Sequence, residues 1–119
     1  MILTLARKFI GSTILAVDKI TSPKPPTRSP EQQAALDEKT CKLVLYEMLA
    51  CPYCVKVRRE IKRQGLNIQR LDVKRSADGM ESLINGGGKF QVPCLRVDNG
   101  ESSQWLYESD DIIEYLRAL

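Results

Sequence analysis

The pattern of hydrophobic and polar positions from residue 41 onward predicts alternating strands and helices. Short hydrophobic runs and strict alternation indicate strands, whereas hydrophobic positions three and four residues apart indicate helices. The run 43–46 (Leu-Val-Leu-Tyr) is too continuous for a strand with one face in water, so we expect a buried strand there. Together the patterns predict strands at 43–46, 67–73, 92–97 and 104–107, and helices at 55–64, 76–83 and 110–119.

Residues that favour turns and helix ends separate these elements. Gly65 follows the first predicted helix at the position where a left-handed glycine commonly ends one. The sequence Asp98-Asn99-Gly100 predicts a hairpin between the last two strands, and 85–88 (Asn-Gly-Gly-Gly) predicts a flexible break. Ser109 is the expected N-cap of the last helix. The order is therefore βαβ, helix, hairpin, helix, which predicts an α/β fold with parallel strands, a right-handed crossover and an antiparallel hairpin.

Residues 1–20 give an amphipathic helix on a helical wheel, with Arg7, Lys8 and Lys19 on the polar face. Only nine residues separate Lys8 from Asp18, whereas a membrane-spanning helix needs about 20 hydrophobic residues. Three interpretations stay open for this helix. It could bind a membrane surface as an interfacial anchor, pack against its own domain or a second copy, or serve as a targeting segment.

A linker follows this helix. Residues 21–30 hold four of the six prolines, which predicts an extended, semi-rigid spacer. Such a spacer holds the first helix away from the rest of the chain and favours the membrane anchor over packing. Residues 31–40 predict a short polar helix, with Ser29 as its N-cap and Pro30 at its first position. We therefore expect a third segment, residues 31–119, to be the main domain.

The charge is unevenly distributed along the chain. Residues 1–30 carry five Lys and Arg and one acidic residue, whereas the remainder carries 13 basic and 14 acidic residues. A near-neutral main domain with one tryptophan argues against nucleic-acid binding. The chain has no histidine, which excludes Cys-His and Ser-His catalysis and every metal site that requires histidine. Any reactive group must be activated by the backbone, by a helix dipole or by Lys and Arg.

The sequence Cys51-Pro52-Tyr53-Cys54 lies where the first predicted strand leads into a helix. Backbone N–H groups are unpaired at a helix N-terminus, so that position stabilises a thiolate. A proline suits the first helical turn, because its missing N–H would have had no partner. Basic residues of the same helix favour the thiolate further: Lys56, Arg58, Arg59, Lys62 and Arg63. In this context the two thiols predict a redox pair in a reducing, cytoplasmic compartment.

This tetrapeptide, the order of elements and the later Val92-Pro93 resemble the dithiol glutaredoxins over about residues 42–119. The resemblance implies a thioredoxin-like fold, with a four-stranded mixed sheet flanked by helices. It also implies glutathione as the electron donor, with no metal expected. In this chain the N-terminal amphipathic helix and the Pro-rich linker would be additions to that fold.

The resemblance also implies a role for each matching residue. Cys51 corresponds to the nucleophile, and Cys54 to the thiol that resolves the intermediate. Pro93 corresponds to the family's cis-proline, which lets Val92 offer its backbone to glutathione. The residues expected to bind glutathione are Tyr53, Val92, Pro93, Ser109 and Asp110.

Three positions depart from the glutaredoxin pattern. Met48 stands where the family often has a lysine that binds a glutathione carboxylate, and Gln91 replaces a threonine. The stretch 107–112 (Tyr-Glu-Ser-Asp-Asp-Ile) is more similar to the N-terminal domains of glutathione transferases. The glycyl end of glutathione therefore has no assigned partner, and Lys89 or Arg58 could replace the missing lysine.

The activity implied is thiol–disulfide exchange by a monomer that reduces protein disulfides or glutathione mixed disulfides. The alternative is a module that binds glutathione, or an iron–sulfur cluster ligated by glutathione, without redox turnover. A zinc site that adds Cys41 and Cys94 to the motif is a further alternative. Cys94 fits better as a small buried residue, and Cys41 as a free, exposed one. Residues 1–20 would add peripheral contact with the inner face of the membrane.

Overall fold

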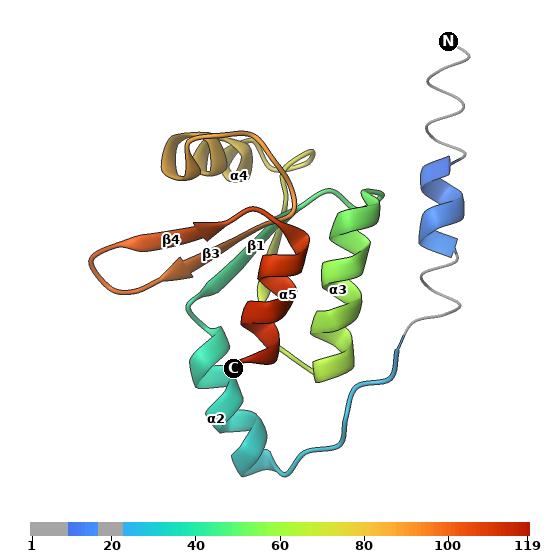
Figure 1. Ribbon diagram of the computed structural model, residues 1–119, viewed down its shortest axis with the longest axis vertical. Coiled ribbons are helices and arrows are strands. Elements are labelled where there is room, and N and C mark those ends of the chain that lie inside the picture. Colours follow the sequence, from blue (N-terminus) through green and yellow to red (C-terminus); the bar gives the residue numbers. More distant parts are fainter. Residues whose placement is uncertain (1–9, 17–22) are drawn as a thin grey trace.

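The computed structural model describes residues 10–16 and 23–119 of the chain (Figure 1). Residues 10–16 are helical and precede the labelled elements. Those elements are α2 (Pro30–Thr40), β1 (Leu43–Glu47), α3 (Pro52–Gln64), β2 (Gln69–Asp72), α4 (Ala77–Ser82), η1 (Leu83–Gly87), β3 (Cys94–Asp98), β4 (Ser103–Leu106) and α5 (Ser109–Arg117). Apart from η1, their order along the chain is the predicted one.

The four strands form one mixed sheet in the order β2-β1-β3-β4 (Figure 1). β1 pairs in parallel with β2, because α3 carries the chain back across the sheet between them. β3 runs antiparallel to both β1 and β4. The turn between β3 and β4 is closed by the Asn99 N–H, which donates to the Ser102 carbonyl at 2.8 Å. The predicted thioredoxin-like architecture is therefore confirmed.

Alternate residues of β1 face opposite sides of the sheet, and helices cover both sides. Leu43 and Leu45 pack in a core with residues of α3 and α5, whereas Val44 and Tyr46 pack with Leu83 of η1. Figure 1 shows α3 and α5 on one side of the sheet and α4 on the other. All five residues of β1 are buried, which confirms the prediction of a buried strand. Residues 48–50 connect the end of this strand to the Cys51–Cys54 motif.

The linker packs against the C-terminal end of α3. Gly65 adopts a left-handed conformation with φ of 64° and ends α3, as predicted. Its carbonyl accepts hydrogen bonds from Gln33 at 3.2 Å and from Arg28 at 3.5 Å. Ser29 caps α2 in a reciprocal capping box with Gln32. These contacts fix the start of α2 beside the end of α3.

The prediction of a flexible break at 85–88 is wrong. The helical chain continues past α4 through the π-helical segment η1, which includes Gly86 and Gly87. A side chain at Gly86 would place its Cβ 2.5 Å from the ring of Trp105, and one at Gly87 would lie 1.8 Å from the Tyr107 hydroxyl. The glycines therefore let two aromatic side chains approach the backbone of η1.

The prediction that Ser109 caps α5 is also wrong. α5 begins at Ser109 itself, and Glu108 occupies the N-cap position with no capping hydrogen bond from its side chain. The acidic residues Asp110 and Asp111 lie in the first turn, where they complement the helix dipole. The start of β3 also differs from the predicted strand at 92–97. β3 begins at Cys94, after Pro93, because proline has no N–H to donate to the ladder.

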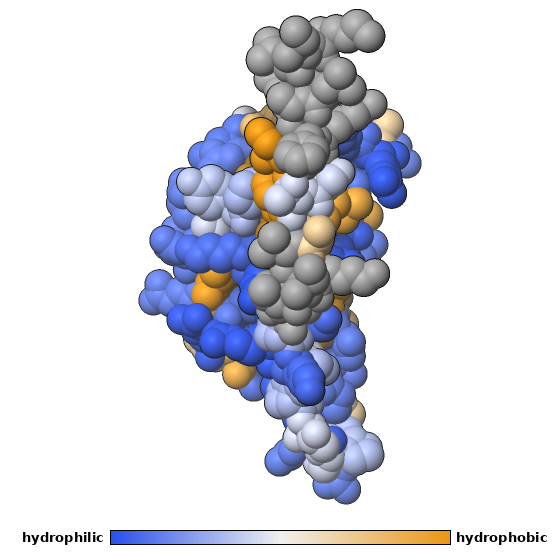
Figure 2. Space-filling view, turned by 90° about the vertical axis from the view of Figure 1, so that its right-hand side faces the viewer, coloured by the Kyte–Doolittle hydropathy of each residue, from blue (hydrophilic) through white to orange (hydrophobic). Residues whose placement is uncertain are grey.

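The prediction of a helix at 1–20 can be compared with the structure only over residues 10–16, which are helical; the rest of it lies outside the described residues. This segment runs alongside α3 in Figure 1, and a Cβ at Gly11 would lie 3.1 Å from that of Ala50. Figure 2 looks onto this side of the molecule, where hydrophilic residues predominate and hydrophobic ones show between them. Among the described residues, no helix is both long enough and apolar enough to cross a membrane.

Candidate active site

Cys51 occupies the N-cap position of α3. Its backbone is extended, with φ of −74° and ψ of 123°, and Pro52 is the first helical residue. The Cys51 carbonyl accepts the first helical hydrogen bond, from the Val55 N–H at 2.9 Å. The first turn contains no acidic residue, and the Cys51 side chain is half-buried. The thiol thus lies at the positive end of the helix dipole, with access to solvent.

Cys54 lies one helical turn further on and is fully buried. The Met48 N–H donates a hydrogen bond to its sulfur at 3.5 Å. Burial raises the pKa of Cys54 to about 12; the Met48 hydrogen bond opposes this shift, and Cys51 and Glu47 add smaller contributions to it. Cys54 is therefore a neutral thiol at physiological pH. The two thiols of the motif therefore differ in exposure, since Cys51 has access to solvent and Cys54 does not. A nucleophilic thiol and a thiol that resolves its adduct must differ in this way.

A cleft of about 350 Å³ lies beside the motif. It brings together the five residues predicted to bind glutathione, which come from α3, from the loop before β3 and from the start of α5. The lining residues are Tyr53, Lys56, Gln91, Val92, Pro93, Tyr107, Glu108, Ser109 and Asp110. Cys51 and Cys54 are not among these lining residues; the cleft adjoins them through Tyr53.

Two backbone features shape this cleft. The peptide bond between Val92 and Pro93 is cis. Ser109 and Asp110 form the first turn of α5, so the helix presents unpaired backbone N–H groups there. Backbone donors of this kind suit a carboxylate, which a helix N-terminus stabilises.

Lys56 is the cation in the cleft, and the sequence analysis did not assign it to glutathione. Its Nζ lies 2.5 Å from Oδ1 of Asp110, and both side chains are more than half exposed. Arg58, which we expected as one replacement for the missing lysine, points into the protein. It donates to Glu47 at 3.2 Å and to the Leu49 carbonyl at 2.7 Å. Lys89 lies 4.6 Å from the ring centroid of Tyr107, at the margin of the cleft.

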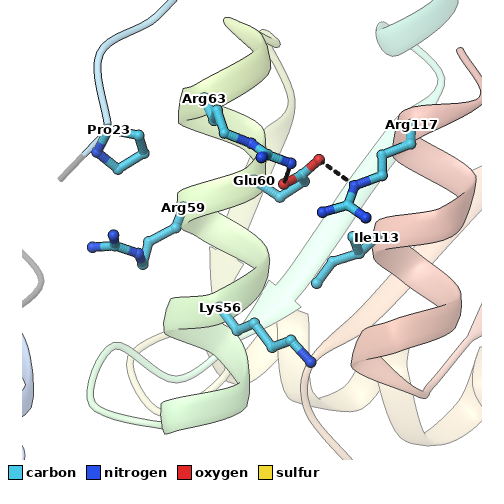
Figure 3. A pocket seen from close by; sticks show the side chains of 7 residues that line it. All are labelled: Pro23, Lys56, Arg59, Glu60, Arg63, Ile113 and Arg117. Atoms are coloured by element: carbon cyan, nitrogen blue, oxygen red, sulfur yellow. Dashed lines mark hydrogen bonds and ion pairs between the residues drawn. The ribbon is translucent and has the colours of Figure 1, made fainter.

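A second hollow, of about 270 Å³, continues from Lys56 between α3 and α5 (Figure 3). In Figure 3 the carboxylate of Glu60 lies between Arg63 and Arg117 and pairs with both. The Arg117 Nε lies 2.9 Å from Oε1 of Glu60. Burial acts to raise the pKa of Glu60, but hydrogen bonds from Arg117, Gln64 and Arg63 outweigh it and hold that pKa below its usual range. This network links the two helices next to the cleft.

The other two cysteines lie in different environments. Cys41 is exposed and donates to the Glu38 carbonyl at 3.1 Å. Cys94 is fully buried, and burial raises its pKa to about 12. In the part of the chain that the structure describes, no group of three or more Cys, Asp or Glu side chains is arranged to hold a metal ion.

Comparisons with known proteins place this chain in a family. The family model described as "Glutathione S-transferase, N-terminal domain" matches residues 45–119. The curated Glutaredoxin 1 of Rickettsia typhi is 27% identical over 59 residues, which are 48% of this chain and 57% of that protein. The alignment therefore spans a little over half the length of that relative.

Two solved glutaredoxin structures share the fold. A wheat glutaredoxin has a TM-score of 0.50 at 20% identity, covering 74% of this chain and 84% of that one. A buckwheat glutaredoxin–glutathione complex has a TM-score of 0.50 at 21% identity, covering 76% and 87%. The family match includes the stretch 107–112, whose similarity to transferase domains was apparent from the sequence. The chain belongs to the family of glutathione S-transferase N-terminal domains, and it shares the thioredoxin-like fold of the solved glutaredoxins.

Proposed function

We propose that this protein is a glutathione-dependent thiol–disulfide oxidoreductase. The observation that carries the proposal is the asymmetry of the motif. Cys51 is half-exposed at a helix N-terminus, and Cys54 is buried one turn away with its pKa raised to about 12. A dithiol that attacks with one sulfur and resolves with the other requires this difference.

In the first step the Cys51 thiolate attacks a sulfur of the substrate disulfide. A Cys51–substrate mixed disulfide forms, and the other substrate sulfur leaves as a thiolate. Cys54 then attacks Cys51, releases the remaining substrate thiol and forms the Cys51–Cys54 disulfide. Two glutathione molecules reduce this disulfide through a Cys51–glutathione adduct and leave as oxidised glutathione. The substrate gains two electrons, and glutathione supplies them.

The cleft beside Tyr53 would hold glutathione during this reaction. We assign the backbone of Val92 to the cysteinyl part of glutathione, and Ser109 and Asp110 to its γ-glutamyl end. Lys56 lines the same cleft and would bind a carboxylate of glutathione, in place of the lysine that is absent at Met48. The glutaredoxin–glutathione complex of buckwheat, which shares the fold, supports glutathione as the ligand.

Turnover of a glutathione mixed disulfide tests the proposal. The assay couples reduction of the mixed disulfide by glutathione to glutathione reductase and follows NADPH consumption. We expect activity in the wild-type protein and a loss of at least about 100-fold in Cys51→Ser, because the hydroxyl cannot replace the thiolate. Cys54→Ser is the matched control and should retain turnover of this small substrate, since glutathione itself can resolve the adduct. Activity that survives Cys51→Ser would refute the assignment of the nucleophile.

The family match also favours a second candidate, a domain that binds glutathione without redox turnover. A glutathione-ligated iron–sulfur carrier is one form of this alternative. Calorimetric binding of glutathione by a protein that is inactive in the coupled assay would support the binding domain. A visible absorption spectrum after anaerobic purification would identify the carrier.

A further inference from the structure

Residues 89–93 form a loop that makes one wall of the cleft. Gln91, Val92 and Pro93 line the cleft, and we assigned the backbone of Val92 to glutathione. The loop starts after Gly88, which ends η1 with φ of 87°, a conformation that favours glycine. The position of this loop therefore sets the shape of the cleft.

Packing fixes only the second half of this loop. Pro93 is buried, and Val92 packs against one of the two core clusters. Lys89 and Phe90 are exposed. Outside the helices and the sheet of the described chain, no hydrogen bond between main-chain groups involves the loop. The first half of the loop therefore needs another support.

Tyr107, which follows β4, provides this support. Its hydroxyl donates a hydrogen bond to the Lys89 carbonyl at 3.4 Å, and the Lys89 Nζ lies 4.6 Å from the centroid of its ring. One side chain thus contacts both the main chain and the side chain of Lys89. Gly87 allows this approach, because a Cβ there would lie 1.8 Å from the Tyr107 hydroxyl. The tyrosine also lines the cleft itself.

Tyr107 also contacts the residue at the other end of the loop. Cys94 directly follows Pro93, and Tyr107 packs against the core cluster that contains its buried thiol. Burial raises the pKa of Tyr107, and Cys94 adds to this shift through its charge and a hydrogen bond. The phenol therefore stays protonated at physiological pH. A neutral thiol can donate to the phenol oxygen while the phenol donates to the Lys89 carbonyl.

We propose that Tyr107 is a positioning residue for glutathione binding. Its hydroxyl holds the start of the loop at Lys89, and its side chain packs beside Cys94 at the end of the loop. The tyrosine thereby keeps Val92 in place to receive glutathione. This inference rests on the proposed function and assigns to its cleft a residue that acts through the loop. Loss of the hydroxyl should let this wall of the cleft move and should weaken binding.

Backbone motion in the ligand-free full chain tests the hold on the loop. NMR order parameters are measured for the amides of residues 89–92 in the wild type and in Tyr107→Phe, which removes only the hydroxyl. We expect values near those of rigid backbone, about 0.85, in the wild type and a fall toward those of flexible chain, below about 0.6, in the variant. The amides of β1 should keep their values in both proteins, which shows that the fold is intact.

Calorimetric titration with S-methylglutathione tests the effect on the cleft. This probe has no free thiol and cannot exchange disulfides, so it measures binding alone. We expect its Kd to rise by about 2- to 10-fold in Tyr107→Phe, the effect of one neutral hydrogen bond. The rate at which iodoacetamide alkylates Cys51 should stay unchanged, because this small reagent does not need the cleft. The two readouts together separate a displaced loop from a damaged thiol.

Tyr46→Phe is the matched control. The Tyr46 hydroxyl is hydrogen-bonded to Arg96 at 2.8 Å and to Ser82 at 3.0 Å, and the residue belongs to the same core cluster but does not line the cleft. This variant should leave the order parameters of the loop and the Kd unchanged. Unchanged order parameters or an unchanged Kd in Tyr107→Phe, or equal changes in both variants, would overturn the inference. A wild-type protein that does not bind S-methylglutathione would instead refute the proposed glutathione site, while the order parameters would still decide whether Tyr107 holds the loop.

Discussion

The two thiols of the motif have different surroundings, and we expect this difference to set their reactivity. Cys51 occupies the N-cap position of α3 and is half-exposed, whereas Cys54 is fully buried with its pKa raised to about 12. Cys94 is buried with its pKa raised to the same value, and Cys41 is exposed. Because alkylating reagents attack thiolates that they can reach, the four cysteines should fall into two classes.

Alkylation of the native, reduced protein at pH 7.5 tests this expectation. Brief treatment with iodoacetamide should modify Cys51 and Cys41 and leave Cys54 and Cys94 unmodified. A raised pKa keeps the thiol neutral, so Cys54 and Cys94 should stay unreactive until the pH approaches about 12 or the fold is lost. Peptide mass mapping measures the modification, and the urea-unfolded protein, in which all four should react, is the control. Labelling of native Cys54 as fast as Cys51 would contradict the structure.

At the scale of single residues, local sequence was enough to predict some positions but not others. The positions of Cys51 and Pro52 follow from the strand-to-helix transition, which a short stretch of sequence specifies. The ion-pair partners of Lys56 and Glu47 are Asp110 and Arg58, which lie on other elements of the fold. No spacing rule relates residues 54 positions apart, as Lys56 and Asp110 are. The sequence therefore shows which residues of a helix are charged, but it does not show which residue pairs with each of them.

At the scale of elements, the glycines of η1 are an adaptation to the neighbouring strand. Composition alone predicts a flexible loop for Asn85-Gly86-Gly87-Gly88, because glycine disfavours regular structure. The structure continues the helix instead, since Trp105 and Tyr107 press on Gly86 and Gly87. This reason lies in β4 and the residues after it, so it could not be read from the segment itself. The strands and the hairpin could be predicted, because local alternation and turn residues specify them.

We expect Gly87→Ala to destabilise the protein by about 1–3 kcal/mol, the usual cost of overpacking. The new Cβ would lie 1.8 Å from the Tyr107 hydroxyl and 3.1 Å from the Trp105 ring. Tyr107→Phe removes the hydroxyl, so the double variant should recover part of the lost free energy of unfolding. Urea denaturation of the wild type, both single variants and the double variant measures this coupling. Strictly additive losses would show that the hydroxyl is not the obstacle.

At the scale of the whole molecule, the thiol site and the N-terminal segment lie on the same side of the domain. Helical residues 10–16 run alongside α3, with Gly11 against Ala50, the residue before Cys51 (Figure 1). The linker also returns to the end of α3 through Arg28 and Gly65. The Pro-rich composition predicted a spacer that holds the helix away from the domain. Over residues 10–16 the helix instead contacts the domain, with Gly11 beside Ala50.

We propose that residues 1–20 bind an anionic membrane surface and thereby bring Cys51 close to it. Arg7 and Lys8 supply positive charge, and each basic residue near such a surface contributes about 1 kcal/mol. The full chain should therefore co-sediment with vesicles that contain phosphatidylserine but not with phosphatidylcholine vesicles, and salt should weaken the binding. Reversing both charges in Arg7→Glu/Lys8→Glu should abolish co-sedimentation. The matched double reversal at exposed Lys42 and Lys74 should leave it unchanged, and equal loss in both variants would indicate non-specific attraction.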